Sequence, residues 1–371
     1  MQYRKLGKTG LEVSVIGFGG VQLSSPNTEY AVKIVHKALE LGVNYFDTAR
    51  IYWDSEIKLG LGLKGNREKI YVSTKTIART KEEAWQGIRE SLERLQTDYL
   101  DNYHLHALQE GEDFEKRLGP GGALGALIEA RDKGLVRNIG CTSHTNRTLV
   151  KALKRFDFDT ILIMMNFVER EPLGELIPLC ESKGVGVTIM KPLATGLLPS
   201  KLALKWLLNQ PIATAVPGAT TLEEVEENSL VGHLNDFTLT AEEEKRVEHL
   251  TDQLEHVRCR MCGECEPCPV GISLWDTLGS DDMYNHYRTM GPDIFRRFPW
   301  DVDKVKNHVK HRRQKISVIQ SCNECGECEK KCPYGLPIIN MLQGMVENME
   351  DMLKIWSEKF NLKTTPFNKE E

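Results

Sequence analysis

The stretch between Tyr45 and Glu56 carries side chains whose types and spacing suit chemistry. It begins as a short apolar strand and continues as a polar loop that holds Asp47 and Tyr52, a carboxylate and a phenol five residues apart. A strand that delivers such groups where it ends is typical of the active face of a (β/α)8 barrel. We therefore expect this loop to lie in an active site.

Two more polar residues end the next two expected strands, Lys75 after the third and His106 after the fourth. A phenol with a pKa of about 10 is a weak acid at neutral pH, and a buried ammonium beside it lowers that pKa. An aspartate partner keeps the lysine charged, and a histidine can hydrogen-bond a substrate oxygen. These four residues predict the protonation of a carbonyl, with a hydride supplied by a reduced nicotinamide.

Eight of the ten cysteines fall in two short runs late in the chain. The first run holds Cys259, Cys262, Cys265 and Cys268, and the second holds Cys322, Cys325, Cys328 and Cys332. The second run fits the spacing C-x2-C-x2-C-x3-C-P of a four-iron cluster, and the first is one residue short before its last cysteine. Paired zinc sites are the alternative, although zinc needs two cysteine pairs rather than triplets followed by Cys-Pro.

The elements that must position these residues follow an alternating pattern. Expected strands begin near Val13 and Val43 and continue at 70–74, 99–105, 136–141, 160–165, 186–190 and 212–216. Amphipathic helix patterns lie between them at 28–41, 81–95, 146–155, 173–183, 201–209 and 221–230. Eight strand–helix units argue for a closed parallel barrel, because an open doubly wound sheet usually has fewer units and carries a glycine fingerprint.

The length of the chain suits either a large domain joined to a small one or two domains of medium size. We expect a (β/α)8 TIM barrel over residues 1–254, a mainly α-helical iron–sulfur domain over 255–356 and a tail over 357–371. The polar, Gly-rich segment 110–122 is predicted to be a surface loop, with a substrate lid as the other interpretation. Residues 4–15 have the pattern of a hairpin.

Global charge and hydropathy favour a cytoplasmic protein. The net charge of −5 gives no indication of binding to nucleic acid or to an anionic membrane. No apolar run reaches about 18 residues, and the first residues lack an apolar signal core. Clustered cysteines in an intracellular protein indicate metal binding rather than disulfides. Cys141 and Cys180 lie in expected barrel elements and are predicted to be core residues.

Over roughly residues 3–250 the sequence resembles the aldo-keto reductase family. The resemblance rests on 46–49 with Tyr52, on 73–75, and on 99–101 leading to His106. It implies a catalytic tetrad of Asp47, Tyr52, Lys75 and His106, with Tyr52 as the general acid. It also implies that a nicotinamide cofactor contacts Ser143, His144, Asn166, Met190, Lys191, Pro192, Leu193, Gly218, Glu224, Glu227 and Asn228.

Several residues depart from the pattern of that family. Leu162 replaces a carboxamide-binding Gln, and Met190 replaces a Tyr that stacks on the nicotinamide. Gly218 and Glu224 lie where NADPH-selective members place cations for the 2′-phosphate, and Lys191 is a nearby cation. Two interpretations remain: an enzyme that uses NAD(H) or NADP(H) on a small carbonyl or alcohol, and an electron-transfer or scaffold protein with a relic reductase pocket.

The two cysteine runs continue alike and resemble the duplicated module of two-cluster ferredoxins. In such modules the fourth cysteine of each run serves the other cluster. The resemblance therefore implies one [4Fe-4S] cluster on Cys259, Cys262, Cys265 and Cys332, and a second on Cys322, Cys325, Cys328 and Cys268. The clusters would pass single electrons or brace the fold. The basic stretch 304–315 is either a docking face for an acidic carrier such as ferredoxin or flavodoxin, or a solvated helix face.

Overall fold

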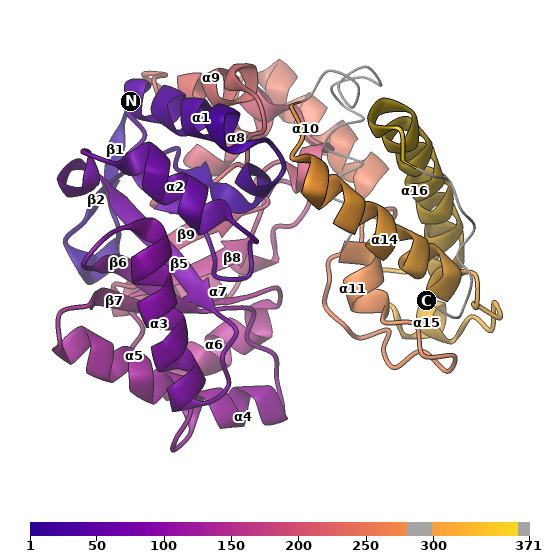
Figure 1. Cartoon of the computed structure of the whole chain (residues 1–371), viewed down its shortest axis with the longest axis horizontal. Helices are drawn as coiled ribbons and strands as arrows, with labels where there is room; N and C mark the ends of the chain where they lie inside the picture. Colours follow the sequence, from indigo (N-terminus) through magenta and orange to yellow (C-terminus); the bar gives the residue numbers. More distant parts are fainter. Residues whose placement is uncertain (280–298, 363–371) are drawn as a thin grey trace. The chain divides into compact units, whose positions relative to one another are not determined.

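The structure is a computed structural model that describes residues 1–279 and 299–362. The chain divides into two compact units, drawn in Figure 1. The first comprises Met1–Ala194 and Pro199–Glu244, and the second comprises Thr195–Leu198 and Lys245–Glu371. The division between them falls within helix α10 (Ala241–Leu254). The domain limits predicted from the sequence remain predictions.

Eight parallel strands form the core of the first unit, and each pairs with the next along the chain. The strands are β3 (Phe18–Gly19), β4 (Tyr45–Asp47), β5 (Tyr71–Thr76), β6 (Leu100–Leu105), β7 (Val136–Ser143), β8 (Thr160–Met164), β9 (Gly186–Met190) and β10 (Thr214–Ala215). Parallel bridges Ile16–Ala215 and Gly19–Gly218 join the first strand to the last. The predicted (β/α)8 barrel is confirmed.

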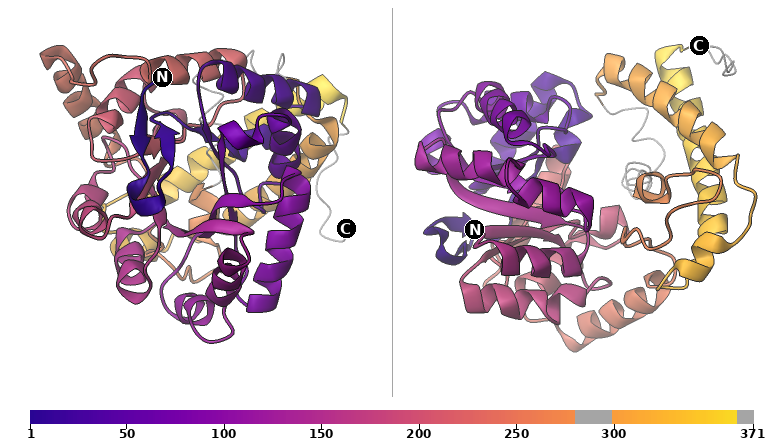
Figure 2. Two further views of the ribbon diagram at one scale, coloured as in Figure 1. Left: turned by 90° about the vertical axis from the view of Figure 1, so that its left-hand side faces the viewer. Right: turned by 90° about the horizontal axis from the view of Figure 1, so that it is seen from below.

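Helices follow the strands and surround the barrel (Figure 2). They are α1 (Thr28–Glu40), α2 (Ser55–Leu63), α3 (Lys81–Leu95), α4 (Glu112–Leu118), α5 (Ala123–Asp132), α6 (Asn146–Arg155), α7 (Leu176–Lys183), α8 (Ser200–Leu208) and α9 (Leu222–Val231). Two of them begin with a capping box, in which Thr80 pairs with Glu83 and Thr221 pairs with Glu224. Local sequence signals therefore fix where these helices start.

A two-stranded hairpin, β1 (Tyr3–Lys5) and β2 (Glu12–Ser14), precedes the barrel as predicted. Leu6 and Val13 from this hairpin are fully buried and share an apolar cluster with Tyr45, at the start of β4, and with Ala213, just before β10. The hairpin thus covers the amino ends of the strands. The carboxyl ends, where barrel enzymes place their chemistry, stay on the opposite side.

The segment 110–122 is not the plain loop that the sequence predicted. It contains α4, which buries Phe114, Arg117 and Leu118. These residues share one helix face at i, i+3 and i+4 spacing. The prediction was wrong because the buried face of this helix is short and one of its three residues is charged. The polar composition of the segment therefore gave no apolar helix pattern.

The second unit is helical wherever it is described as regular structure. Besides most of α10, the helices in its described residues are α11 (Leu274–Gly279), α14 (Val302–Ile319), α15 (Glu327–Lys331) and α16 (Ile338–Phe360). Helices α14 and α16 run side by side (Figures 1 and 2), with Trp300 and Trp356 packed between them at a ring-centre distance of 5.4 Å. Helix α16 continues beyond the predicted domain limit at residue 356, and residues 363–371 of the predicted tail lie outside the described residues.

None of the helices in the described ranges is both long enough and apolar enough to cross a membrane. The prediction that the protein is cytoplasmic goes beyond this finding and remains a prediction.

Polar side chains occupy part of the barrel interior. His104 on β6 contacts Thr160 on β8, with Nε2 and Oγ1 2.9 Å apart. The two side chains meet across Gly140 on β7, where an added Cβ would lie 2.3 Å from His104 Cδ2 and 2.4 Å from Thr160 Oγ1. Gly140 therefore leaves the space that His104 fills.

We predict that Gly140→Ala lowers the free energy of unfolding of the barrel by about 2 kcal/mol, because overpacking a filled core typically costs 1–3 kcal/mol. The matched control is Gly125→Ala on α5, where the nearest atom to an added Cβ is Lys81 Cδ at 3.7 Å. That change should stabilise the helix by up to about 1 kcal/mol. Urea unfolding followed by circular dichroism measures both, and equal effects of the two substitutions would contradict the account.

Candidate active site and cysteine centre

Four side chains meet at the carboxyl ends of β4, β5 and β6. Lys75 Nζ is fully buried and donates to Asp47 Oδ2 and to the Thr48 carbonyl oxygen, both at 2.6 Å. The same ammonium lies 5.0 Å from the centre of the Tyr52 ring. His106 meets Tyr52 edge-on, with the ring centres 5.7 Å apart. The structure therefore brings together the four residues that the sequence selected.

The loop that carries Tyr52 is fixed by the start of α2. Ser55 Oγ donates to the Gly20 carbonyl at 2.6 Å, and Ser55 N donates to the Tyr52 carbonyl at 2.8 Å. Glu56 is buried, accepts a hydrogen bond from Thr74 Oγ1 at 2.8 Å and forms an ion pair with Arg94 at 3.1 Å. Thr74 precedes Lys75 on β5, so Glu56 ties the tyrosine loop to the strand that holds the lysine.

The charge on the lysine is stabilised by its neighbours. Burial lowers the pKa of Lys75, but attraction to Asp47 and Tyr52, with their hydrogen bonds, outweighs burial and raises that pKa above its usual value. His106 behaves in the opposite way, because burial and then the Lys75 charge hold its pKa well below the usual value. At neutral pH the site therefore contains an ammonium beside a neutral imidazole.

The predicted acidification of Tyr52 is corrected by the structure. Lys75 lowers the pKa of this phenol as expected, but burial is the larger effect and raises the pKa above its ordinary value. The sequence supplied the neighbouring cation but not the loss of solvation around the phenol of Tyr52, a residue that is half-buried. At neutral pH Tyr52 therefore stays protonated, which is the form of a phenol that can donate a proton.

Residues expected to bind a nicotinamide lie around the ends of β7 and β8. Ser143 is buried and its Oγ donates to the Leu108 carbonyl at 2.8 Å, and His144 follows it at the end of β7. Asn166 uses its whole amide within the chain. Its Nδ2 donates to Glu169 Oε2 and to the Lys191 carbonyl, and its Oδ1 accepts from the backbone N–H groups of Val168 and Glu169. A contact between Asn166 and a cofactor amide would replace one of these bonds.

The remaining expected cofactor contacts lie after β9 and β10. Met190 ends β9, and Lys191, Pro192 and Leu193 follow it, with Lys191 in the left-handed region at φ 52°. Leu162, in the middle of β8, lies in an apolar cluster with Tyr45 and Val216, and Met190 packs against this cluster.

After β10, Gly218 lies against Gln22, whose Oε1 would be 1.9 Å from a Cβ added at the glycine. Glu224 caps α9 by accepting from Thr220 and Thr221, Asn228 accepts from Ser200 at 2.7 Å, and Glu227 is exposed. The structure thus gives Glu224 and Asn228 structural partners.

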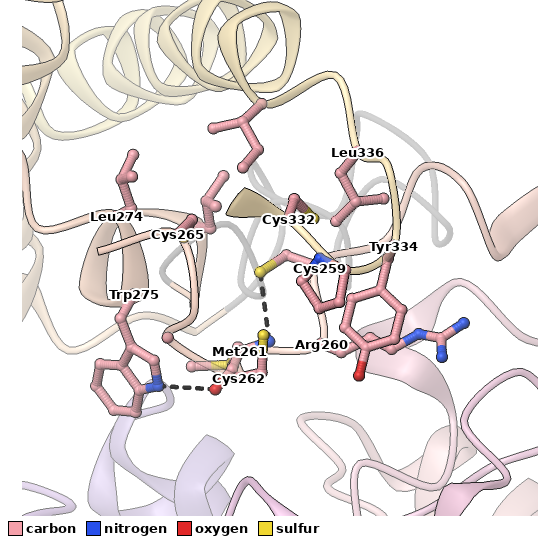
Figure 3. Close-up of a pocket in the computed structure, with 14 residues that line it drawn as sticks. Cys259, Arg260, Met261, Cys262, Cys265, Leu274, Trp275, Cys332, Tyr334 and Leu336 are labelled. Carbon is pink, nitrogen blue, oxygen red and sulfur yellow. Dashed lines mark hydrogen bonds between the residues drawn. The ribbon is translucent and has the colours of Figure 1, made fainter. Parts of the chain in front are cut away.

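A pocket in the second unit gathers cysteines from both runs (Figure 3). The four are Cys259, Cys262, Cys265 and Cys332. Met261 N donates to Cys259 Sγ at 3.3 Å, and Trp275 Nε1 donates to the Met261 carbonyl at 3.0 Å. Apolar residues complete the lining, among them Leu274, Leu278, Leu336 and Ile338. This is the set of thiols that the ferredoxin resemblance assigned to one cluster.

One apolar core contains cysteines of both predicted sets, including three of the four in the second set. Cys328 is buried in it, and Cys268 and Cys322 pack against it, whereas Cys325 is exposed. No group of three or more His, Cys, Asp or Glu side chains in the described ranges is arranged to hold a metal ion. The predicted core positions of Cys141 and Cys180 are confirmed, since both side chains are fully buried.

The two cysteine loops repeat one backbone conformation. Met261 and Glu324 occupy equivalent places, each has a φ of 54°, and each directs its N–H at the first cysteine of its run, at 3.3 Å and 3.4 Å. After the fourth cysteine, Gly271 N donates to the Cys268 carbonyl and Gly335 N donates to the Cys332 carbonyl. The duplication read from the sequence therefore extends to hydrogen bonds.

The duplication includes a pair of acidic residues that the sequence analysis missed. Glu266 follows the third cysteine of the first run and accepts from Trp275 N, near the start of α11, at 2.9 Å. Glu329 follows the third cysteine of the second run and accepts from Ile339 N, near the start of α16, at 3.0 Å. Each carboxylate links a cysteine loop to the helix that follows it. Their matching places after Cys265 and Cys328 were the signal that could have revealed them.

Two different protein families match the two parts of the chain. Residues 15–201 match the Aldo/keto reductase family, and residues 258–337 match the 4Fe-4S dicluster domain. The L-galactose dehydrogenase of Arabidopsis thaliana is 31% identical over 311 residues, which cover 69% of this chain and 96% of that protein.

Solved structures agree with this match. The holo form of aldo-keto reductase AKR11C1 from Bacillus halodurans has a TM-score of 0.60 at 29% identity, covering 67% of this chain and 96% of that one. An aldo/keto reductase from Klebsiella pneumoniae in complex with NADP and acetate shares the fold, with a TM-score of 0.57 at 21% identity, and covers 68% of this chain and 96% of that one.

A parallel eight-stranded barrel with an acid, a lysine, a tyrosine and a histidine at its carboxyl end defines an oxidoreductase of aldo-keto reductase type. The chain belongs to the aldo/keto reductase family and carries a C-terminal 4Fe-4S dicluster domain. The resemblances read from the sequence are confirmed.

We predict that acid destabilises the barrel through its buried histidines. Burial holds the pKa of His104 at about 3, below the 6.5 of an ordinary histidine, so between these values the unfolded chain binds more protons and the free energy of unfolding falls as the pH falls. The loss should be about 2 kcal/mol for His104 between pH 6.5 and pH 5, at about 1.36 kcal/mol per unit.

Urea unfolding at pH 7 and pH 5 tests this with His104→Gln, which should reduce the difference between the two pH values. The exposed His36→Gln serves as the control and should leave the difference unchanged. An unchanged pH dependence in His104→Gln would show that another group causes the acid sensitivity.

Proposed function

We propose that this chain reduces a small carbonyl compound, or oxidises the corresponding alcohol, with a nicotinamide cofactor. The observation that carries the proposal is the buried Lys75 ammonium, held by Asp47 and facing the Tyr52 ring, with His106 edge-on to the same ring. A bound nicotinamide would supply the hydride to the carbonyl carbon. The protein groups then have to supply a proton and hold the oxygen in place.

Tyr52 is the proton donor in this proposal. Its raised pKa keeps the phenol protonated at neutral pH, and the Lys75 charge stabilises the phenolate that forms when the proton moves to the substrate oxygen. Asp47 keeps Lys75 charged and in position. His106, neutral in this site, hydrogen-bonds the substrate oxygen. The hydride and the Tyr52 proton together account for the two electrons and two hydrogens that an alcohol has beyond a carbonyl.

The cofactor would be held at the ends of β7–β10. Ser143, His144 and Asn166 are proposed to bind the nicotinamide, with Met190 to Leu193 beside it. Gly218, Glu227 and Asn228 are proposed to bind the adenosine half, and the Klebsiella pneumoniae protein of this fold binds NADP. Because Glu224 already caps α9, its carboxylate is committed to the helix start rather than to a ribose or a phosphate.

Tyr52→Phe should lower the rate of carbonyl reduction about a hundredfold or more, because a positioned general acid contributes 10²–10⁴-fold. The matched control is Tyr71→Phe, which removes a phenol at the amino end of the same barrel. NADPH- or NADH-dependent reduction of 4-nitrobenzaldehyde or phenylglyoxal, followed at 340 nm, provides the measurement. Equal rates for Tyr52→Phe and wild type would refute the assigned role.

The cysteines are proposed to hold two [4Fe-4S] clusters with exchanged fourth ligands. The first set is Cys259, Cys262, Cys265 and Cys332, and the second is Cys322, Cys325, Cys328 and Cys268. The pocket that gathers the first set and the backbone N–H groups aimed at Sγ atoms support this assignment. Clusters transfer single electrons and hydride transfer moves two, so the proposed role of the clusters is electron exchange with a separate carrier, such as ferredoxin or flavodoxin.

Two double variants test the exchange of ligands. Cys259→Ala with Cys332→Ala should damage one cluster and leave about half of the iron and sulfide, whereas Cys259→Ala with Cys268→Ala should damage both clusters. Anaerobic iron and sulfide counts with electron paramagnetic resonance provide the readout. Cys180→Ala, in the barrel core, should retain the wild-type iron content. The reverse order of the two double variants would show that each run ligates its own cluster.

A second candidate function is an electron-transfer or scaffold protein with a relic reductase pocket. The observations that favour it are the saturated amide of Asn166, the apolar environment of Leu162 and the use of Glu224 as a helix cap. Fluorescence titration with NADH and NADPH separates the candidates. Binding of either cofactor supports the reductase, and binding of neither at millimolar concentration supports the relic pocket.

A further inference from the structure

Arg117 is a buried cation that none of the roles above uses. It lies on α4, in the segment whose composition suggested a loop, and its side chain is 2% exposed. Nη1 donates to the His106 carbonyl oxygen and Nη2 donates to the Thr76 carbonyl oxygen, both at 2.8 Å. A buried guanidinium that binds two backbone carbonyls fixes the distance between them.

The two carbonyls belong to the strand ends that carry the reactive groups. Thr76 ends β5 directly after Lys75, and His106 directly follows β6. His106 N also donates to the Thr76 carbonyl at 2.9 Å, so this oxygen receives hydrogen bonds from both His106 and Arg117. The Arg117 guanidinium thereby adds to the hydrogen bonds that join the end of β5, the strand that carries Lys75, to the backbone of His106.

Backbone placement matters here because the imidazole has little other support. Among the side chains that the structure describes, none hydrogen-bonds Nδ1 of His106. Its ring is in edge contact with Tyr52. The position of the imidazole relative to the phenol therefore depends on where the His106 backbone is held.

Arg117 is itself held in place by α4. Its Nη1 lies 3.5 Å from Asp113 Oδ2, one helical turn earlier, and Asp113 also accepts from Gln109 N and pairs with Arg79. Phe114 is buried on the same face of the helix. Helix α4 therefore holds the planar guanidinium of Arg117, with its two donating nitrogens, at the carboxyl ends of the strands.

We propose that Arg117 is a positioning residue that sets the place of His106 against Tyr52 and Lys75. The expected effect of Arg117 on the reaction rate rests on the proposed reductase function. The expected effect of Arg117 on His106 rests on the geometry alone. The guanidinium also adds a positive charge beside the imidazole. The other titratable groups around His106 are Lys75 on β5, His104 on β6, Tyr52 after β4 and His144 after β7. Removing the Arg117 charge should therefore make His106 easier to protonate.

The first test is independent of activity. In the full-length holoprotein labelled with ¹³C-histidine, the His106 signal is assigned from the His106→Gln spectrum and titrated by NMR. Arg117→Gln should shift the titration of His106 to higher pH, whereas Arg117→Lys, which keeps a cation but loses the planar fork, should titrate near wild type. The exposed Arg89→Gln on α3 is the control for a general change of charge. An unchanged His106 titration in Arg117→Gln would overturn the electrostatic part of the inference.

The second test uses reduction of 4-nitrobenzaldehyde or phenylglyoxal. Because a small displacement of a reacting group is costly, kcat should fall between about tenfold and a hundredfold in Arg117→Gln, with a smaller fall in Arg117→Lys and little change in KM. Circular dichroism checks that the variants are folded, and Arg117→Lys remains informative if Arg117→Gln is not. Wild-type kcat in a folded Arg117→Gln would overturn the positioning role. Absence of activity in the wild type would instead refute the proposed reductase, and the NMR titration would still test Arg117.

Discussion

A lysine ammonium without access to solvent is the constraint on which the barrel site depends. A buried charge is costly unless a counter-charge and hydrogen bonds compensate it. Asp47 and the Thr48 carbonyl provide both for Lys75, and they come from the neighbouring strand β4 and the residue after it. Since β4 and β5 pair in parallel register, their carboxyl ends meet, and the charge pair is possible only because the strands are adjacent. The position of Tyr52 follows, because its loop continues directly from β4.

Contacts that support Lys75 and Asp47 lie on two sides of this charge pair. On one side, Glu56 and Ser55 fasten the tyrosine loop to β5 and to the segment after β3. On the other, Arg117 joins the ends of β5 and β6. Beneath the site, His104 and Thr160 fill the interior at Gly140. Neutral histidines and a charged lysine coexist there because burial and the lysine charge both disfavour protonation of the histidines.

The cysteine unit follows a different principle, which is repetition. Two loops with the same left-handed positions direct N–H groups at equivalent sulfur atoms, and two equivalent glutamates join those loops to the helices that follow. The first run is one residue shorter, and only the second run forms the short helix α15 before its last cysteine. The repeat therefore preserves the hydrogen bonds around the thiols while the backbone between the third and fourth cysteines differs.

The sequence by itself determined the barrel, the polar residues that end its strands and the two cysteine runs, because these depend on local periodicity, on which residues end each strand, and on fixed spacing. Helix 81–95 was placed correctly because its capping residue and its apolar face are both local features. Helix 146–155 was placed correctly from its apolar face, without a side-chain cap.

Only the tertiary structure decided what depends on burial and on contacts between distant residues. Three features of the site involve groups far apart in the chain. They are the raised pKa of Tyr52, the contact of His104 with Thr160 at Gly140, and the hydrogen bonds of Arg117 to the carbonyls at two strand ends. A charged residue in a polar segment is predicted to be exposed to solvent. Its burial can be recognised only when the strands around it are in place.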